Sequence, residues 1–132
     1  MAIKKDSGFQ DASVKTLTIA FGDPTAFGTA ENAIELPIGA TVTNGDIIVD
    51  TAFNSTTNTL TIGDVTVPTR YAAAVDLKTA ARTVFTLTGF KTTATQRFIQ
   101  VNVAQTGGVP TAGSVRVNVH YIVDKRVYAA VG

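Results

Sequence analysis

Hydrophobic and polar residues alternate along several short segments of this 132-residue chain. In residues 14–21, the side chains of Leu17, Ile19 and Phe21 fall on one face and threonines fall on the other, which is the period of a half-buried β-strand. Residues 97–105 and 114–123 alternate in the same way, with Ile, Val and Tyr recurring at every second position. Because the loop between these two segments is rich in glycine and also holds a proline, the pattern predicts that they form a β-hairpin.

The middle of the chain contains further short strands and the signals that end them. Pro37 interrupts the β-forming segment 33–43, because proline lacks the N–H group that a central strand must donate. The dipeptide Asn44-Gly45 follows between β-forming residues and is the strongest short sequence signal for a hairpin turn. Further strands are expected over residues 46–53, 59–62 and 83–88.

Residues 70–81 depart from the β pattern. Alanine is dense in this segment, and Tyr71, Ala74 and Lys78 recur at helical spacing, while Thr69 precedes them as a candidate N-cap. The sequence therefore predicts one short helix here, which would cover an open end or face of the sheets.

The composition agrees with a β-rich fold of one domain. The chain has 22 threonines and 16 valines, and these β-branched residues suit a pleated surface. Parallel βαβ repetition is absent, so the predicted fold class is all-β, an antiparallel β-sandwich of jelly-roll type. An immunoglobulin-like sandwich is the second choice, because no Cys…Trp…Cys pattern supports it. Residues 1–13 lack periodicity and are predicted to form an N-terminal arm, with a single sandwich domain over residues 14–132.

Composition also excludes several classes of function. The chain has no cysteine and one histidine, which excludes disulfides, a thiol nucleophile and a multi-histidine zinc site. Its net charge is +1, so no strong field attracts nucleic acid or an anionic membrane. No segment approaches the roughly 20 apolar residues that span a bilayer, and no apolar run follows Lys4 and Lys5 to make a secretory signal. Charged residues make up only 16% of the chain, which favours a surface that packs densely against neighbours.

The residues with catalytic or ligating side chains form no recognisable motif. His120 is the only imidazole, and alternation places it on an outer face, where a catalytic role would need a carboxylate such as Asp50 or Asp124 within reach. Asp46, Asp50 and Asp64 could suggest calcium, but the alternating aspartates of a calcium loop are absent, and Asp46 and Asp64 follow glycines, which is typical of turns. We therefore expect no catalytic residue, no metal and no cofactor.

Two further motifs point away from nucleotide and nucleic-acid chemistry. Gly107-Gly108 lacks the lysine and the following helix of a phosphate-binding loop. Arg97, Arg116 and Arg126 would bind nucleic acid only if they shared one face, and the chain has no basic block. The sequence predicts no direct contact with nucleic acid or with a membrane.

Several motifs nevertheless resemble those of a known group of proteins. Residues 35–55 read ELPIGATVTNGDIIVDTAFNS, and they are followed by Ile62-Gly63-Asp64, by Arg70-Tyr71 before an alanine-rich segment, and by Tyr121-Ile122-Val123-Asp124. Together these motifs, over residues 34–124, resemble small structural proteins of tailed bacteriophages, namely head decoration or cement proteins.

This resemblance implies a jelly-roll protein that is made in the host cytoplasm and sits on the outside of the virion capsid. It implies that the partner is the major capsid protein, whose neighbouring subunits it clamps, and that the protein is a homo-oligomer, either a dimer or a trimer. We expect the arm and the loops at 22–32 and 105–113 to contact the shell. The predicted interface residues are Ile3, Lys4, Lys5, Phe9, Phe27, Val109 and Pro110.

Other functions remain open at this point. The chain is also compatible with another phage structural part, such as a tail or fibre component, although a major coat protein is usually larger. A carbohydrate-binding sandwich would need exposed aromatic side chains for stacking on sugars, but the chain has no tryptophan and only three tyrosines, Tyr71, Tyr121 and Tyr128. A small enzyme is disfavoured by the absence of a catalytic motif.

Overall fold

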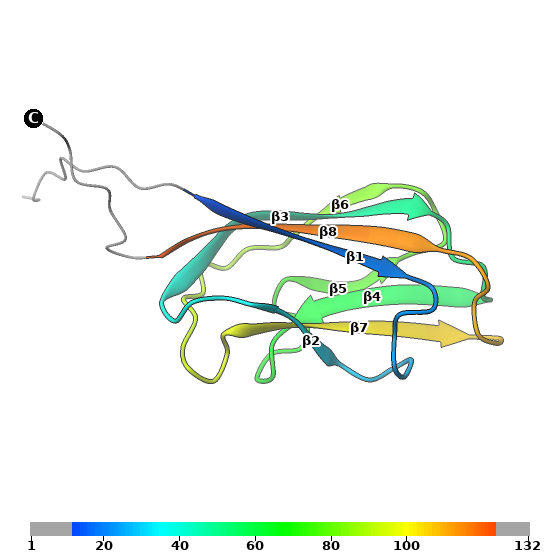
Figure 1. Ribbon diagram of the computed structural model, residues 1–132, viewed down its shortest axis with the longest axis horizontal. Helices are drawn as coiled ribbons and strands as arrows, with labels where there is room; N and C mark the ends of the chain where they lie inside the picture. Colours follow the sequence, from blue (N-terminus) through cyan, green and yellow to red (C-terminus); the bar gives the residue numbers. More distant parts are fainter. Residues whose placement is uncertain (1–11, 124–132) are drawn as a thin grey trace, which may run out of the picture.

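The computed structural model describes residues 12–123, and this part of the chain forms eight strands in two facing sheets (Figure 1). The strands are β1 (Ser13–Ala20), β2 (Glu31–Glu35), β3 (Ala40–Thr51), β4 (Thr57–Gly63), β5 (Ala72–Asp76), β6 (Arg82–Val84), β7 (Phe98–Thr106) and β8 (Ser114–Val123). Within these residues no helix is long and apolar enough to cross a membrane. Residues 1–11 of the predicted arm and the end of the chain from Asp124 lie outside the described residues.

The strand pairing identifies a jelly roll. β1 pairs with β8, β2 with β7, β3 with β6 and β4 with β5, and every pair is antiparallel. Such pairing arises when one long hairpin, with its tip between β4 and β5, is rolled up so that successive pairs alternate between two layers. The layers have the strand orders β1-β8-β3-β6 and β2-β7-β4-β5. The predicted all-β antiparallel sandwich is confirmed, and the eight strands match the jelly-roll arrangement.

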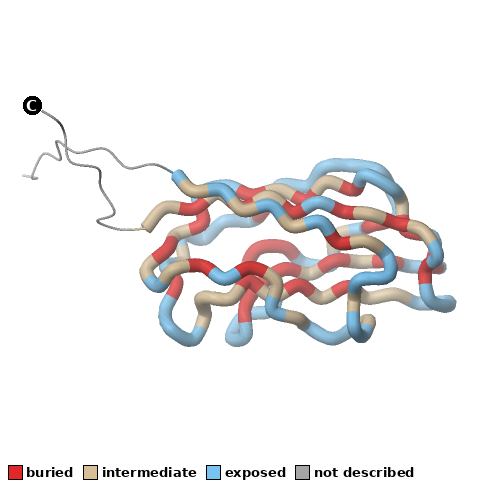
Figure 2. The backbone as a smooth tube through the Cα atoms, in the orientation of Figure 1, coloured by how far each residue is buried: buried red, intermediate tan, exposed pale blue. Residues whose placement is uncertain are grey.

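The core consists of the alternate residues that each sheet turns toward the other. Val115, Val117 and Val119 of β8 are completely buried, and they face Ile99 and Leu60 from the opposite layer. Figure 2 shows buried residues along the strands of both layers and exposed residues in most of the connecting loops. Each fully buried aliphatic side chain contributes about 1.5–3 kcal/mol relative to exposure to water, so the alternation that predicted the strands also stabilises the fold.

The predicted hairpin of residues 97–105 and 114–123 is wrong. Both strands exist, as β7 and β8, but they belong to different sheets, and the loop between them crosses from one layer to the other. Alternation identifies the buried face of a strand. The same alternation is expected whether two strands lie side by side in one sheet or face each other across the core, so it does not predict which strands pair.

The predicted helix over residues 70–81 is also wrong, because no helix occurs between residues 12 and 123 and this segment contains β5. The backbone N–H of Tyr71 donates to Ile62 O at 3.0 Å, and that of Leu77 donates to Asn58 O at 3.0 Å. Both side chains are buried in the core. An isolated helix of about 12 residues is marginal even when rich in alanine, so pairing with the edge of β4 prevails over helix propensity.

Asn44-Gly45 does not form the predicted hairpin turn, because it lies inside β3. The ladder between β3 and β8 shifts register between Val42 and Asn44, which makes a β-bulge at this point. Gly45 is required here for space, since an added Cβ atom would lie 2.4 Å from the ring of Phe85. The predicted break at Pro37 is confirmed, because β2 ends before it and β3 begins after it.

A second bulge, in β5, gives a prediction about stability. The register shift between Leu60 and Ile62 of β4 leaves Ala74 with a φ of 45°, a conformation that costs alanine about 1–2 kcal/mol. We expect Ala74→Gly to raise the free energy of unfolding by about 0.5 kcal/mol, because this gain exceeds the entropy lost with glycine. Ala73→Gly, at an exposed neighbour without positive φ, should lower it by about 0.5–1 kcal/mol. Urea unfolding of both variants measures the change in the free energy of unfolding. Equal decreases in the two variants would contradict this account.

Candidate functional site: interaction surfaces

The two predicted interface loops meet at one end of the sandwich. The backbone N–H of Phe21 donates to Gly113 O at 3.0 Å, which joins the β1–β2 loop to the β7–β8 loop. Val109 is 69% exposed there. Phe27 is half-buried against the core, and Pro110 is buried within this chain, so Val109 offers the most surface of the three predicted residues.

The predicted arm leaves the sandwich at the other end. β1 begins at Ser13, at the end where β8 finishes and away from the β1–β2 and β7–β8 loops (Figure 1). The start of β1 and the two loops therefore lie at opposite ends of the domain. The predicted contact residues Ile3, Lys4, Lys5 and Phe9 lie outside the described residues.

A row of hydrogen bonds crosses the outer face of the β1-β8-β3-β6 sheet. Thr16 Oγ1 donates to Asn118 Oδ1 at 3.0 Å, Asn118 Nδ2 donates to Asp46 Oδ1 at 2.8 Å, and Arg82 Nε donates to Asp46 Oδ2 at 2.8 Å. These four side chains come from four different strands. Burial acts to raise the pKa of Asp46, but the hydrogen bonds from Arg82 and Asn118 outweigh it, so this pKa is lowered. These hydrogen bonds keep the Asp46 carboxylate ionised, and Arg82 balances its negative charge.

His120 shares this face but has no catalytic arrangement around it. Of its candidate partners, Asp50 accepts two hydrogen bonds from Arg116, at 2.7 and 3.1 Å, and Asp124 lies outside the described residues. The hydrogen bond to Asp50 raises the pKa of Arg116 above its ordinary value. His120 Nδ1 is buried with no hydrogen-bond partner. No carboxylate within residues 12–123 orients this imidazole as an acid–base group.

The three aspartates considered for calcium lie in three separate ion pairs. Asp46 pairs with Arg82, Asp50 with Arg116 and Asp64 with Arg70. Over residues 12–123, no three acidic or histidine side chains come close enough to hold a metal ion. Each of these carboxylates is neutralised by its own arginine.

Asp64 organises the β4–β5 loop, toward the end of the sandwich where β1 begins and β8 ends (Figure 1). Its side chain is 1% exposed, and Oδ1 accepts hydrogen bonds from the backbone of Thr66 at 2.9 Å and of Val67 at 2.8 Å. Oδ2 accepts a hydrogen bond from Arg70 Nε. The guanidinium of Arg70 in turn lies 3.4 Å from the centre of the Phe90 ring, a cation–π contact. The motifs Gly63-Asp64 and Arg70-Tyr71 therefore form one structural unit.

Arg97 and Arg116 do not share a face. Arg97 pairs with Glu35 at 3.0 Å beside the β2-β7-β4-β5 sheet, whereas Arg116 belongs to the other sheet. Arg126 lies outside the described residues. The part of the chain that the structure describes thus brings no two of these arginines together as a nucleic-acid surface.

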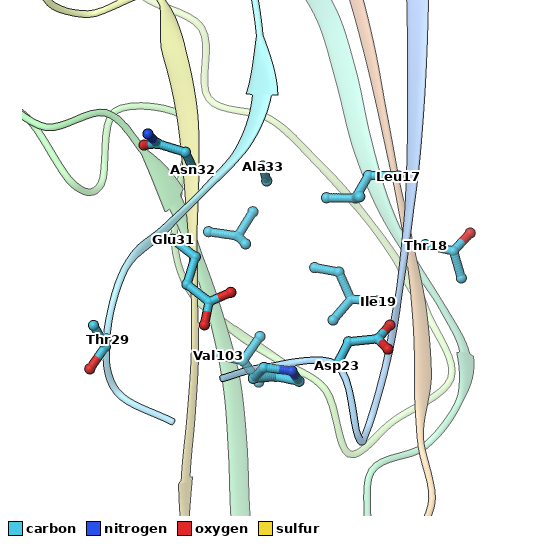
Figure 3. A pocket seen from close by; sticks show the side chains of 11 residues that line it. Leu17, Thr18, Ile19, Asp23, Thr29, Glu31, Asn32, Ala33 and Val103 are labelled. Atoms are coloured by element: carbon cyan, nitrogen blue, oxygen red, sulfur yellow. The ribbon is translucent and has the colours of Figure 1, made fainter. Parts of the chain in front are cut away.

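A groove opens along one side of the sandwich, between the edge strands β1 and β2 (Figure 3). We call it the edge groove, and its volume is about 240 Å³. Apolar side chains from both sheets line it, and two carboxylates stand beside them. The apolar residues are Leu17, Ile19, Ala33, Val101 and Val103, and the carboxylates are Asp23 and Glu31.

Sequence reasoning missed the edge groove. The alternation correctly predicts that Leu17 and Ile19 face the core, whereas Phe21, which follows β1, is 39% exposed. The predicted loop 22–32 includes Asp23, but Glu31 is the first residue of β2. That β1 and β2 lie at the same side of two different sheets follows from the rolled topology alone.

Comparisons with known proteins give structural neighbours only. No family model and no curated sequence matches the chain. The fold is similar to a chain in the capsid asymmetric unit of cyanophage Pam1, with a TM-score of 0.69, 28% identity, and coverage of 93% of this chain and 91% of that one. A chain in the acid-stable capsid of Helicobacter pylori bacteriophage KHP30 has a TM-score of 0.67 at 16% identity, covering 96% and 98%. A chain in the capsid of Ralstonia phage GP4 has a TM-score of 0.60 at 17% identity, covering 95% of this chain and 92% of that one.

Proposed function

We propose that this protein is a structural component of a bacteriophage virion, and specifically a decoration or cement subunit. It binds the outside of the assembled shell, contacts the major capsid protein, and acts as a homo-oligomer. The observation that carries the proposal is the similarity to the chain in the cyanophage Pam1 capsid, at 28% identity over 93% of this chain. The structural similarity to phage capsid chains supports a phage structural protein, and the decoration role is our proposal.

The chemistry of the described surface supports a binding role. Four carboxylates are neutralised by arginines, and the outward residues of the central strands β4 and β7 are neutral, among them Thr59, Thr61, Gln100 and Asn102. Covering such a surface desolvates few unpaired charges, which keeps the cost of close packing low. On a shell that repeats the same site many times, weak contacts of an oligomer add up through multivalency.

The end of the sandwich that holds Val109 and Phe27 is the surface that we assign to the shell. Both side chains lie in loops that the two sheets hold in place, and Val109 is largely exposed. Loops on a rigid β scaffold are the usual location of binding residues, because they vary without disturbing the core.

Binding to particles tests the proposal. The full-length protein is mixed with capsids of the encoding phage that lack it, and bound protein is measured by sedimentation and located by electron microscopy. We expect saturable binding at a fixed ratio on the capsid exterior, and a higher temperature of particle disruption. Val109→Asp should weaken binding at least about tenfold, since a charge must then be buried at the contact.

Val65→Asp is the matched control, because Val65 is also an exposed valine, at 58%, but lies in the β4–β5 loop at the opposite end. It should bind as the wild type does. Equal losses in both variants would refute the assignment of the shell contact to the Val109 end. Absence of the protein from virions would refute the structural role, whereas a position on the tail would replace the decoration role with a tail or fibre role.

A further inference from the structure

We propose that the edge groove binds the N-terminal segment of a second copy of this chain. In this contact Ile3 enters the apolar part of the groove, and the adjacent Lys4 and Lys5 pair with Asp23 and Glu31. The inference concerns contacts between copies and holds whichever larger assembly the protein joins.

The edge groove is an incompletely closed part of the core. β1 and β2 are edge strands of different sheets, so among the strands of residues 12–123 none bridges them on this side. Ile19 and Val101 are buried, but Leu17 and Ala33, which line the same groove, are only half-buried (Figure 3). An apolar side chain that entered here would complete the burial of residues that already point inward.

Each of the two carboxylates beside the groove accepts a hydrogen bond from a backbone N–H group close to it in the chain. Asp23 Oδ2 accepts the backbone N–H of Ala20 at 2.7 Å, and Glu31 Oε1 accepts that of Thr25 at 2.8 Å. These bonds hold the carboxylates in place without neutralising them. Within residues 12–123 neither forms an ion pair, whereas four other carboxylates each pair with an arginine. The groove therefore suits an apolar side chain that is flanked by cations.

The first residues of the chain have this character. Ile3 is followed directly by Lys4 and Lys5, and Phe9 is the next large apolar residue. In an extended segment, neighbouring side chains point to opposite sides. With Ile3 in the groove, Lys5 lies on the same side of the segment and Lys4 on the opposite side, from which its flexible four-carbon side chain reaches back to the rim. Asp23 and Glu31 stand on opposite sides of the opening.

Geometry favours a second copy over the chain's own segment. Ser13 and Ile19 are separated by about 20 Å along β1, at about 3.4 Å per residue, and the groove lies near the Ile19 end. To reach it in the same chain, the segment would have to reverse at residues 10–12, where Asp11 alone favours a turn and no glycine or proline is present. A turn at Asp6-Ser7-Gly8 would not suffice either. A chain that reversed there would bring Ile3 back only beside about residue 12, before β1 begins. An extended segment instead reaches about 33 Å outward, toward a neighbour.

The absence of cysteine allows a direct test in the full-length protein. Two separately purified variants, one with Ile3→Cys and one with Ala33→Cys, are mixed under mild oxidation, so a mixed disulfide forms only between copies. The control mixture combines Ile3→Cys with Ala73→Cys, at an exposed alanine in β5, on the opposite edge. We expect the mixed disulfide to form at least tenfold faster with Ala33→Cys than with the control, and more slowly as salt is added.

A charge exchange tests the recognition itself. Asp23→Lys with Glu31→Lys, added to the Ala33→Cys chain, should slow cross-linking at least tenfold, and Lys4→Glu with Lys5→Glu in the other chain should restore it. The salt dependence of the original pair provides a readout that does not require the exchanged variants to fold. Equal rates for Ala33→Cys and the control, or cross-linking only when both cysteines are in one chain, would overturn the proposal. Rates that are insensitive to both salt and charge exchange would also overturn it.

Discussion

Asp64→Ala is expected to lower the free energy of unfolding by about 3–5 kcal/mol, because it leaves the charge of Arg70 buried without its partner. Asp64 is 1% exposed and Arg70 is 13% exposed, so water replaces little of the lost interaction. The substitution also removes the acceptor of two backbone N–H groups, those of Thr66 and Val67. Urea unfolding followed by circular dichroism measures the change. Asp76→Ala removes an exposed carboxylate that accepts one backbone hydrogen bond, and it should cost less than about 1 kcal/mol.

The same residue predicts how stability responds to acid. Burial acts to raise the pKa of Asp64, but hydrogen bonds from Arg70, Val67 and Thr66 outweigh it, so the folded-state pKa lies below the ordinary value of 3.8. A lowered pKa contributes stability that is fully present above the unfolded-state pKa and is lost as the pH falls through the folded-state pKa. The wild type should therefore lose stability below about pH 4, and Asp64→Ala should lose less over this range. Parallel pH profiles for the two proteins would show that Asp64 does not stabilise this loop through its charge.

Gly45→Ala is expected to lower the free energy of unfolding by about 2–3 kcal/mol, because an alanine Cβ atom has no space beneath Phe85. The ring atoms of Phe85 would lie 2.4–2.8 Å from that Cβ, and the ring cannot move away easily. The backbone N–H of Phe85 donates to Gly45 O at 2.9 Å, and the Tyr71 ring lies 5.8 Å from the Phe85 ring, centre to centre. Thermal or urea unfolding measures the loss.

The combination Gly45→Ala with Phe85→Leu distinguishes this cause from a backbone effect. If the ring is the obstacle, the pair should be less destabilised than the sum of the two single changes by at least about 1 kcal/mol. If Gly45 instead lay in a two-residue hairpin turn, alanine there would be strained by the positive φ of the turn, and Phe85→Leu would restore no stability. Gly22→Ala is the neutral control, since no atom lies within 4 Å of its added Cβ and its φ is not positive. Strict additivity of the two changes would refute the steric explanation.

The two functional proposals together describe how a small sandwich could form a repeating layer. In these proposals, the end that carries Val109 contacts the shell, and the segment that precedes β1 binds a neighbouring copy. Because the segment and the edge groove are different surfaces, the contact between copies is heterologous, and such contacts form rings when the rotation closes. In a ring of three copies, every edge groove would bind the N-terminal segment of a neighbour. The same holds for a dimer whose two copies exchange their segments. Both fit the oligomers that the sequence resemblance implies.

The sequence by itself determined which residues enter the core and which chemistries the chain lacks. Val115, Val117 and Val119 were assigned to the core from their spacing, and the structure buries them completely. Pro37 determined the break between β2 and β3, because proline lacks a backbone N–H donor in any fold. The absence of cysteine and the presence of a single histidine limited the chemistry in the same direct way. These properties are local, and they depend on the period of the strand or on the side chain alone.

Only the tertiary structure decided which strands pair. β7 and β8 are neighbours in sequence with matching alternation, yet they lie in opposite sheets. Residues 72–76 form a strand because they pair with the edge of β4, and Asn44-Gly45 lies within β3 because both residues pair with β8. The edge groove exists because two edge strands from different layers lie on the same side. Backbone hydrogen bonds between distant segments determine each of these outcomes, and the local pattern is the same for every choice of partner.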